Sequence, residues 1–432
     1  MGVENSRLQG FYKLSVEERR NLVAKIANLS EEHVSAWANT GELSENAADR
    51  VIENVIGTMA MPVGVATNFI IDGEHYLIPF ALEEPSVVAA ASNMAKRCHS
   101  NGGFYSNNDD PIMIGQIQVV GCENPLAAKE SILSSKSELI SLCNDVDPIL
   151  VKFGGGCRDI NVRIIDTDSG AMVIAHLLVD CRDAMGANAV NTMAESIAPK
   201  IEEITGGTVI LRIISNLAIH RLARVSATFS PEEMADSKGD ASDGDEVING
   251  ILQAYHFAAA DPFRATTHNK GIMNAISPIA LACGQDWRAI ESGAHSFASH
   301  GRTYGSLTHW EKDSNGNLVG TIEVPMAVGL VGGAVRVHPT AIANVALLGI
   351  KSADELAKVM AAAGLAQNLG ALRALATVGI QAGHMKLHSR NMAVAAGATD
   401  DEVDEVVNMA NSSGERITAK LIEDIIQKIR NN

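Results

Sequence analysis

Four short segments of the chain each hold one reactive side chain among small or apolar neighbours. They are Glu84 in LEEPSVVAAAS, Lys270 in THNKGIMN, Asp286 in CGQDWRA and His384 in AGHMKLH. A lysine can stabilise an oxyanion, a glutamic acid can deliver a proton, and a histidine can protonate a departing thiolate. Together with a second carboxylate, these groups predict an enzyme that reduces a thioester.

Each of these residues also has an ordinary structural interpretation. A lysine such as Lys270 usually extends from a helix surface into water. Asp286, between the apolar LACGQ and Trp287, is expected to be a buried, paired carboxylate, and a helix cap is the alternative. His384 and His388 have the i, i+4 spacing of many metal-binding pairs. Zinc needs a third ligand and usually the glutamate of HExxH, which HMKLH lacks, so we expect no metal.

Six motifs in this order resemble hydroxymethylglutaryl-CoA reductase in its soluble, class II form. The resemblance covers nearly the whole chain. The motifs are ENVIG (53–57), EEPS (83–86), DAMGAN (183–188), NKG (269–271), GQDWRA (284–289) and GHMKLH (383–388).

The resemblance implies an enzyme that interconverts hydroxymethylglutaryl-CoA with mevalonate plus CoA through two nicotinamide-dependent hydride transfers. Isoprenoid biosynthesis and mevalonate catabolism would use the same site. Another CoA-thioester-reducing NAD(P)H oxidoreductase is the alternative. An acylating aldehyde dehydrogenase would need a reactive cysteine, and a catalytically silent CoA-binding protein would be expected to lack one of the four reactive residues.

The resemblance also implies a role for each site residue. Lys270 would hold the thioester or aldehyde oxygen in one network with Glu84 and Asp286, and His384 would protonate the CoA thiolate. Arg264 would bind the free carboxylate of the substrate, which suits a bidentate guanidinium. The substrate contacts implied are Ser86, Arg264, Asn274, Gln367, Asn368 and His388. Asn368 could instead cap a turn.

The chain lacks both GxGxxG and a P-loop, so the dinucleotide needs another site. DAMGAN predicts a strand-to-helix turn, where free backbone N–H groups and a glycine suit a pyrophosphate. A capped helix start without a ligand is the ordinary alternative. The resemblance implies these cofactor-binding residues: Asp147, Asp183, Ala184, Met185, Gly186, Asn188 and Asn216.

Asp147 precedes three consecutive glycines (154–156) and matches the acidic position of NADH-using relatives. A carboxylate there would accept from a ribose 2′-hydroxyl and repel a 2′-phosphate. We therefore expect NADH to be preferred, with NADPH possible, although NDVDP is also an ordinary turn sequence.

The pattern of apolar residues predicts the helices and strands that position these side chains. Strand and helix signals after residue 111, with one helix expected at 128–142, give the βαββαβ order of a ferredoxin-like unit. We expect an α+β fold: a mainly helical large domain (1–110 and 223–378), an inserted ferredoxin-like, dinucleotide-binding small domain (111–222) and a mobile helical C-terminal flap (379–432).

Local signals place Glu84 more closely. Asp72-Gly73 between two apolar runs predicts a hairpin, and Pro85 predicts a helix start with Glu84 at its N-cap end. Ser15 with Glu18 and Thr399 with Glu402 predict capping boxes.

Bulk composition excludes some partners. The 432 residues exceed one ordinary core, and the net charge of −17 argues against nucleic acid and anionic membranes. No apolar run reaches the roughly 18 residues of a membrane span, and the start of the chain lacks a signal-peptide plan. We expect a cytoplasmic protein.

The resemblance further implies a homodimer, or an assembly of dimers, with the active site at the subunit interface. One departure concerns CoA: where relatives carry an N-terminal arginine, this chain has Tyr12, next to Lys13.

Six cysteines are scattered without a CxxC. We expect reduced, mostly buried thiols. Cys283, three residues before Asp286, could line the site, but its apolar LACG context favours a packing role.

Overall fold

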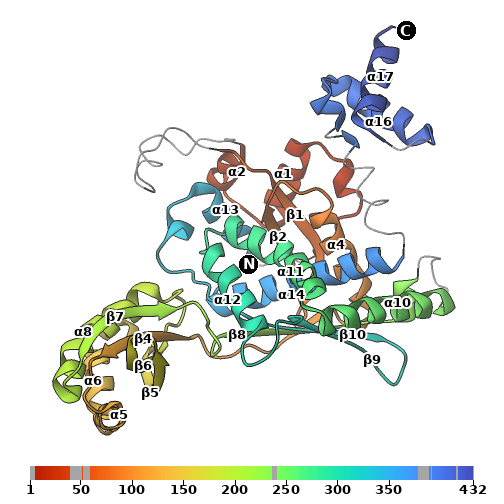
Figure 1. The fold of residues 1–432 in the computed structure, drawn as a ribbon. Helices are drawn as coiled ribbons and strands as arrows, with labels where there is room; N and C mark the ends of the chain where they lie inside the picture. Colours follow the sequence, from red (N-terminus) through yellow and green to blue (C-terminus); the bar gives the residue numbers. More distant parts are fainter. Residues whose placement is uncertain are drawn as a thin grey trace.

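The computed structural model describes residues 5–38, 51, 59–235, 241–377, 389–390, 392–414 and 417–431. Helices surround two separate sheets, with strand orders β2-β1-β3-β8-β10-β9 and β5-β6-β4-β7. Figure 1 shows the smaller sheet and its helices beside the main body, with α16 and α17 standing away from both. The α+β prediction is confirmed.

The larger sheet begins with the predicted hairpin. Ile71 pairs with Glu74 across Asp72 and Gly73, which both have positive φ (52° and 83°), as a tight turn requires. Its strands are β1 (Val63–Ile71), β2 (Glu74–Ala81), β3 (Phe104–Ser106), β8 (Leu222–Phe229), β9 (Thr308–Lys312) and β10 (Leu318–Pro325).

Helix α14 lies at the centre of the main body and contacts α4, α10 and α11. Small residues permit this close packing: a Cβ added at Gly364 would lie 3.0 Å from the Ile276 side chain of α11. The helices of this body are α4 (Val87–Arg97), α9 (Pro231–Met234), α10 (Ala241–Ala260), α11 (Pro262–Ala282), α12 (Trp287–Ala298), α13 (Pro339–Leu348) and α14 (Ala353–Ala376), with the 3₁₀ turns η2 (His99–Asn101) and η3 (Ala334–Arg336).

Within the described ranges, α14 alone is long and apolar enough to cross a membrane. However, 67% of its most apolar window is buried inside the protein. The apolar composition is therefore that of a core helix.

The smaller sheet has the ferredoxin-like order, because its first and third strands, β4 and β6, are central and all neighbours are antiparallel. The single helix expected at 128–142 is wrong, since Ser135 ends one helix and begins the next. The elements are β4 (Ile112–Val120), α5 (Pro125–Ser134), α6 (Lys136–Val146), α7 (Pro148–Lys152), β5 (Gly156–Thr167), β6 (Gly170–Asp180), α8 (Ala187–Thr205) and β7 (Thr208–Ser215).

Both ends of the chain form helices with the predicted capping boxes, at Ser15 with Glu18 and at Thr399 with Glu402. The C-terminal pair packs around its own small core, which includes Val406 and Ile422. These terminal elements are η1 (Phe11–Lys13), α1 (Val16–Ile26), α2 (Glu31–Ala38), α16 (Asp400–Ser412) and α17 (Ala419–Arg430).

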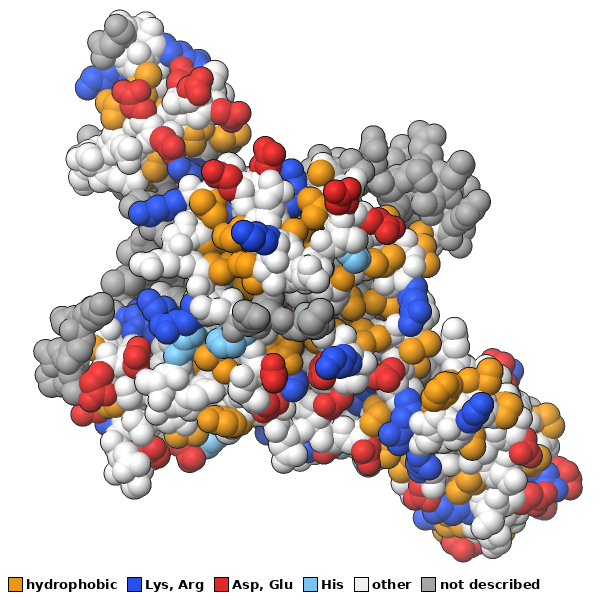
Figure 2. All heavy atoms as spheres, turned by 180° about the vertical axis from the view of Figure 1, so that it is seen from behind, with side chains coloured by type: hydrophobic (Ala, Val, Ile, Leu, Met, Phe, Trp, Pro, Cys, Tyr) orange, Lys and Arg blue, Asp and Glu red, His pale blue; other side chains and the backbone are white. Residues whose placement is uncertain are grey.

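The surface charge is mixed. On the face seen from behind in Figure 2, basic and acidic side chains are interspersed rather than gathered by sign. The described residues on that face therefore form no continuous basic stripe of the kind that a nucleic-acid partner needs.

Candidate active site

Glu84 and Lys270 lie in direct contact. The Lys270 Nζ atom is 3.0 Å from Glu84 Oε2, although 186 residues separate them in the chain. Glu84 follows β2, Lys270 lies within α11, and α11 packs against β2. The two side chains are 37% and 58% exposed, so a substrate can reach the pair.

The turn after Glu84 is strained. Ser86 has φ 75° and is the N-cap of α4, which begins at Val87. The prediction that Pro85 starts this helix is wrong by two residues. A non-glycine residue in the left-handed region is uncommon and costs free energy, which is typical of functional sites.

Asp286 is the N-cap of α12. Its carboxylate accepts from Ala289 N at 3.1 Å and lies 3.7 Å from an Arg288 nitrogen, with 42% of the side chain exposed. The expected burial is wrong, and the helix-cap alternative is confirmed. Within the part of the chain that the structure describes, the expected three-residue network is limited to Glu84 and Lys270.

Helix α11 carries three of the predicted residues. Arg264 lies in its first turn, where Asp261 caps the helix by accepting from Arg264 N at 2.8 Å. Burial lowers the pKa of the Arg264 guanidinium. Lys270 and Asn274 are four residues apart, so they share one face of the helix.

Gln367 and Asn368 on α14 differ in their surroundings. Gln367 is 6% exposed, and its Oε1 atom has no hydrogen-bond partner among the described residues. Asn368 is 1% exposed, and its Oδ1 accepts from Thr308 Oγ1 at 3.0 Å and Trp310 Nε1 at 2.9 Å. The alternative that Asn368 caps a turn is wrong, because it lies inside α14 and connects it to β9.

His268 completes this buried polar cluster. Its Nε2 atom lies 3.1 Å from Asn368 Nδ2 and 2.8 Å from Thr308 Oγ1. Burial, and then the charge of Arg264, lower the pKa of His268 to about 3. The ring is therefore neutral near pH 7 and fixes α11, which carries Lys270, against β9 and α14.

The predicted proton donor His384 and its neighbour His388 lie outside the described residues, as does the ENVIG motif.

The DAMGAN motif forms the predicted strand-to-helix turn. Strand β6 ends at Asp180, and Gly186 with φ 108° is the N-cap of α8. A Cβ on Gly186 would lie 2.5 Å from Cys181 Sγ, so only glycine fits. Since glycine offers no side-chain acceptor, the first N–H groups of α8 are directed toward any ligand at the turn, next to the exposed Asn188. This arrangement fits a dinucleotide phosphate.

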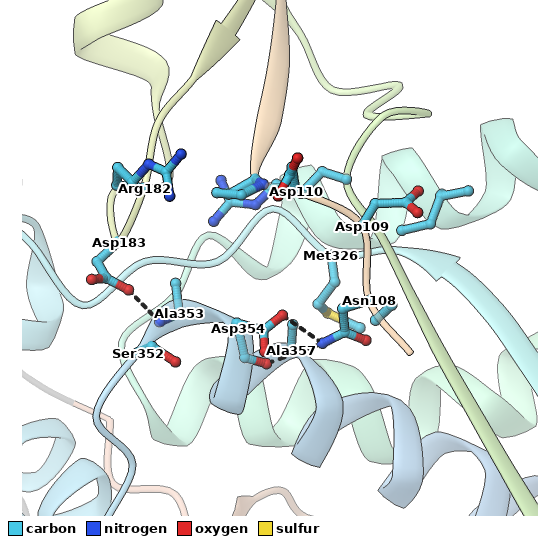
Figure 3. A pocket seen from close by; sticks show the side chains of 14 residues that line it. Asn108, Asp109, Asp110, Arg182, Asp183, Met326, Ser352, Ala353, Asp354 and Ala357 are labelled. Carbon is cyan, nitrogen blue, oxygen red and sulfur yellow. Dashed lines mark hydrogen bonds between the residues drawn. The ribbon is translucent and has the colours of Figure 1, made fainter. Parts of the chain in front are cut away.

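Asp183 has a structural partner. Its Oδ1 accepts from Ala353 N at 2.7 Å, at the start of α14 (Figure 3). Asp183 also lines a cavity of about 350 Å³, together with Asn108, Arg182 and Asp354. This cavity lies where the domain of the larger sheet meets the domain of the smaller sheet. Glu84, Lys270 and Asp286 do not line this cavity, so it is separate from the pair described above.

Two further predicted cofactor residues lie at element ends. Asp147 is the N-cap of α7 and accepts from Leu150 N at 2.9 Å, as the ordinary turn interpretation expects. Asn216 follows β7, and its carbonyl oxygen packs against α12, where a Cβ on Gly293 would lie 2.5 Å away.

Sequence reasoning missed the residue that holds the DAMGAN turn from behind. Arg221 is 5% exposed and donates to the carbonyl oxygens of Ala184 (3.0 Å) and Met185 (3.1 Å). An arginine in the stretch IHRLARVS, which also contains Arg224, is a weak signal of a buried cation.

The cysteines are free thiols, and all but Cys122 are buried. Burial raises the pKa of the Cys283 thiol to about 12, which supports its packing role. A hydrogen bond from Cys143 lowers the pKa of Cys157, but Cys157 is only 3% exposed. Within the described ranges, no three His, Cys, Asp or Glu side chains are arranged to hold a metal ion.

Comparisons with known proteins agree on one family. The family model described as hydroxymethylglutaryl-coenzyme A reductase matches residues 15–389. An enzyme of that name from Archaeoglobus fulgidus is 57% identical over 426 residues, 99% of this chain and 95% of its own length. A probable one from Borreliella burgdorferi is 32% identical, covering 88% of this chain and 85% of its own length.

Solved structures give the same result. The reductase from Streptococcus pneumoniae superposes with a TM-score of 0.82 at 38% identity, covering 98% of this chain and 99% of its own. A class II structure from that organism, bound to NADPH in open conformations, gives a TM-score of 0.81 at 40% identity over 85% of this chain and 99% of its own.

Proposed function

The chain belongs to the hydroxymethylglutaryl-CoA reductase family, and we propose that its active site is built around Lys270 and Glu84. The enzyme is an NAD(P)H-dependent oxidoreductase that converts hydroxymethylglutaryl-CoA to mevalonate and CoA, or the reverse. In the reductive direction the reaction consumes two NAD(P)H and two protons and releases two NAD(P)⁺. The observation that carries the proposed site is the 3.0 Å contact between Lys270 Nζ and Glu84 Oε2 at an exposed position.

Lys270 and Glu84 act on the carbonyl oxygen. The lysine cation stabilises the negative charge that grows there, and the pair delivers a proton to that oxygen in the second reduction. A nicotinamide cofactor held at the DAMGAN turn would supply the hydride for the carbonyl carbon. The family resemblance alone assigns Asp286 a supporting role, since its carboxylate caps α12 in the single chain. His384 protonates the thiolate of CoA when it leaves.

Substrate contacts come from α11, α14 and the strained turn. Arg264 binds the free carboxylate, and its half-buried setting strengthens such a charge pair. Gln367 offers a buried Oε1 atom with no partner among the described residues, which suits a hydroxyl donor of the substrate. Ser86 and Asn274 are further substrate contacts. Asn368 lies next to Gln367 and supports the substrate site, and His388 lies near the CoA portion of the substrate. Lys13 binds CoA in this chain, where relatives use an N-terminal arginine.

The cofactor binds at the DAMGAN turn. Asp183, Ala184, Met185, Gly186, Asn188 and Asn216 form this site, with the phosphate at the N-terminus of α8. Asp147 makes NADH the preferred cofactor and NADPH a slower one. A related class II enzyme from Streptococcus pneumoniae binds NADPH, so this preference requires a direct comparison.

The active protein is a homodimer, or an assembly of dimers, in the cytoplasm. Two aromatic side chains flank the start of α11 and are open to solvent in the single chain, Phe257 at 58% and Phe263 at 87%. Exposed aromatics beside a substrate residue such as Arg264 suit a subunit interface.

We also propose the boundaries 111–222 for the cofactor domain and 379–432 for the flap, since each region has its own hydrophobic cluster.

Nicotinamide absorbance tests the function. Purified protein is mixed with hydroxymethylglutaryl-CoA and either NADH or NADPH, then with mevalonate, CoA and either oxidised cofactor. Two cofactor equivalents per thioester are expected. Absence of turnover with both cofactors in both directions would exclude the reaction.

Two lysine variants test the site. Lys270→Ala is expected to abolish turnover with the fold intact. Lys312→Ala is the matched control, because Lys312 also pairs with a carboxylate, Asp245 at 2.8 Å, and lies outside the site. Equal activities of the two variants would exclude the role of Lys270.

A further inference from the structure

The cofactor turn, residues 183–186, is in contact with the segment 326–330, which follows β10. Gln285, just before α12, contacts that segment in turn. Gly329 is the point of closest approach. A Cβ added to Gly329 would lie 2.3 Å from Met185 N and 2.8 Å from Ala184 C. The backbone of Gly329 therefore lies directly on the backbone of the turn, with no room for a side chain.

Gln285 holds Gly329 from the other side. Its Oε1 accepts from Gly329 N at 2.8 Å, and its Nε2 donates to Gly329 O at 2.9 Å. Both polar atoms of one amide are thus used on one residue, which fixes the position of Gly329 in two directions. Gln285 immediately precedes Asp286, the carboxylate that caps α12.

Arg221 joins two of these segments, residues 183–186 and residues 326–330. Besides the Ala184 and Met185 carbonyls, its guanidinium donates to Val328 O at 2.5 Å. Burial lowers the pKa of Arg221, while Asp180, Asp183, Asp354 and the Cys181 thiol act in the opposite direction. The planar, five-donor guanidinium suits three carbonyl oxygens, whereas a lysine has one nitrogen for all of them. Leu330 N adds a fourth link by donating to Asp183 O at 2.8 Å.

We propose that Arg221 and Gln285 are positioning residues that set the distance between the cofactor turn and the segment bearing Asp286. Hydride transfer depends on the separation of nicotinamide and carbonyl carbon, and a displacement of about 1 Å is enough to slow such a step strongly. The link runs from the turn through Gly329 and Gln285 to Asp286, so neither residue touches substrate. The proposal rests on the proposed cofactor site at residues 183–188.

Two variants test these contacts. Gln285→Met keeps the side-chain volume and removes the amide, and Arg221→Lys keeps the positive charge and removes the planar set of guanidinium donors. Each is expected to raise the dissociation constant of NADH and NADPH, read by nicotinamide fluorescence without turnover, by about tenfold. Each should also lower kcat for mevaldehyde reduction at saturating cofactor on the order of tenfold. The double variant should lose less than the product of the single effects, because the two residues act on one segment.

Asn344→Leu is the control. Asn344 is a buried amide that donates to Ala282 O at 2.8 Å and accepts from Trp37 Nε1 at 3.1 Å, away from the turn. This variant is expected to lower the melting temperature and leave cofactor affinity and kcat unchanged. Folded Gln285→Met and Arg221→Lys proteins with affinity and kcat within twofold of the parent would overturn the proposal, as would equal losses in Asn344→Leu. Failure of the proposed function would instead appear as a parent protein that neither binds cofactor nor turns over.

Discussion

The Asp183 carboxylate accepts a hydrogen bond from Ala353 N, so the turn assigned to the cofactor also caps the central helix α14. Ser352 caps the same helix by accepting from Glu355 N at 3.1 Å. The first turn of α14 is thus satisfied partly by its own N-cap and partly by the small domain. In the proposed cofactor site, Asp183 would therefore serve both cofactor binding and the anchoring of α14.

Replacement of Asp183 should therefore affect stability as well as binding. Asp183→Ala is expected to lower the free energy of unfolding by about 1 kcal/mol, the usual cost of a lost cap. Asp183→Asn keeps an acceptor and should lose less. Urea unfolding, followed by circular dichroism, measures both values. Unchanged stability of Asp183→Ala would show that solvent replaces this cap without cost.

His268 should make the protein less stable in mild acid. Its pKa is about 3 in the folded protein, below the ordinary value of 6.5, so the unfolded chain binds the proton more readily. The contribution of a neutral His268 is complete above pH 6.5 and is lost progressively as the pH falls from 6.5 toward 3. At pH 5 the expected loss is about 2 kcal/mol.

The measurement compares urea unfolding at pH 7.5 and pH 5 for the parent and for His268→Gln. Carboxylates titrate in both proteins, so the difference between their pH dependences isolates the histidine. Two parallel profiles would contradict a neutral, buried His268.

Asp147 should decide the choice of cofactor. If its carboxylate meets the ribose 2′-hydroxyl, Asp147→Ala will raise the KM for NADH and lower that for NADPH. A change in preference on the order of tenfold is expected from the loss of one charge-assisted contact. Asp145→Ala, two residues earlier, is the control. If Asp147→Ala only lowers the melting temperature, its role is limited to capping α7.

His384 should matter more for the thioester than for the aldehyde. Only the first reduction releases a thiolate, so His384→Ala is expected to slow reduction of hydroxymethylglutaryl-CoA much more than reduction of added mevaldehyde. A loss on the order of a hundredfold is typical when a general acid is removed. Equal losses with both substrates would exclude this role.

The local elements were predictable because their signals lie in neighbouring residues. Asp72-Gly73 specifies its hairpin, Ser15 with Glu18 specifies a cap, and the alternation of strands and helices after residue 111 specifies the ferredoxin-like order. The Glu84–Lys270 contact required the family resemblance, since 186 residues separate them.

Other features were missed for physical reasons. Arg221 contacts only carbonyl oxygens, which every residue possesses, so its partners leave no mark on the sequence. Ser86 adopts a positive φ that residue type alone does not indicate. Asp286 satisfied two patterns at once, an acid near apolar residues and a helix cap, and the structure shows the cap.

The separate core of the C-terminal helices has a consequence for hydrogen exchange. Residues along α14 such as Leu356, Met360, Leu365 and Leu369 are fully buried, so its amides should exchange only when the whole main body unfolds. The cluster around Val406 and Ile422 contains few buried side chains. Amides of α16 and α17 should therefore exchange through a local opening that requires much less free energy, long before those of α14.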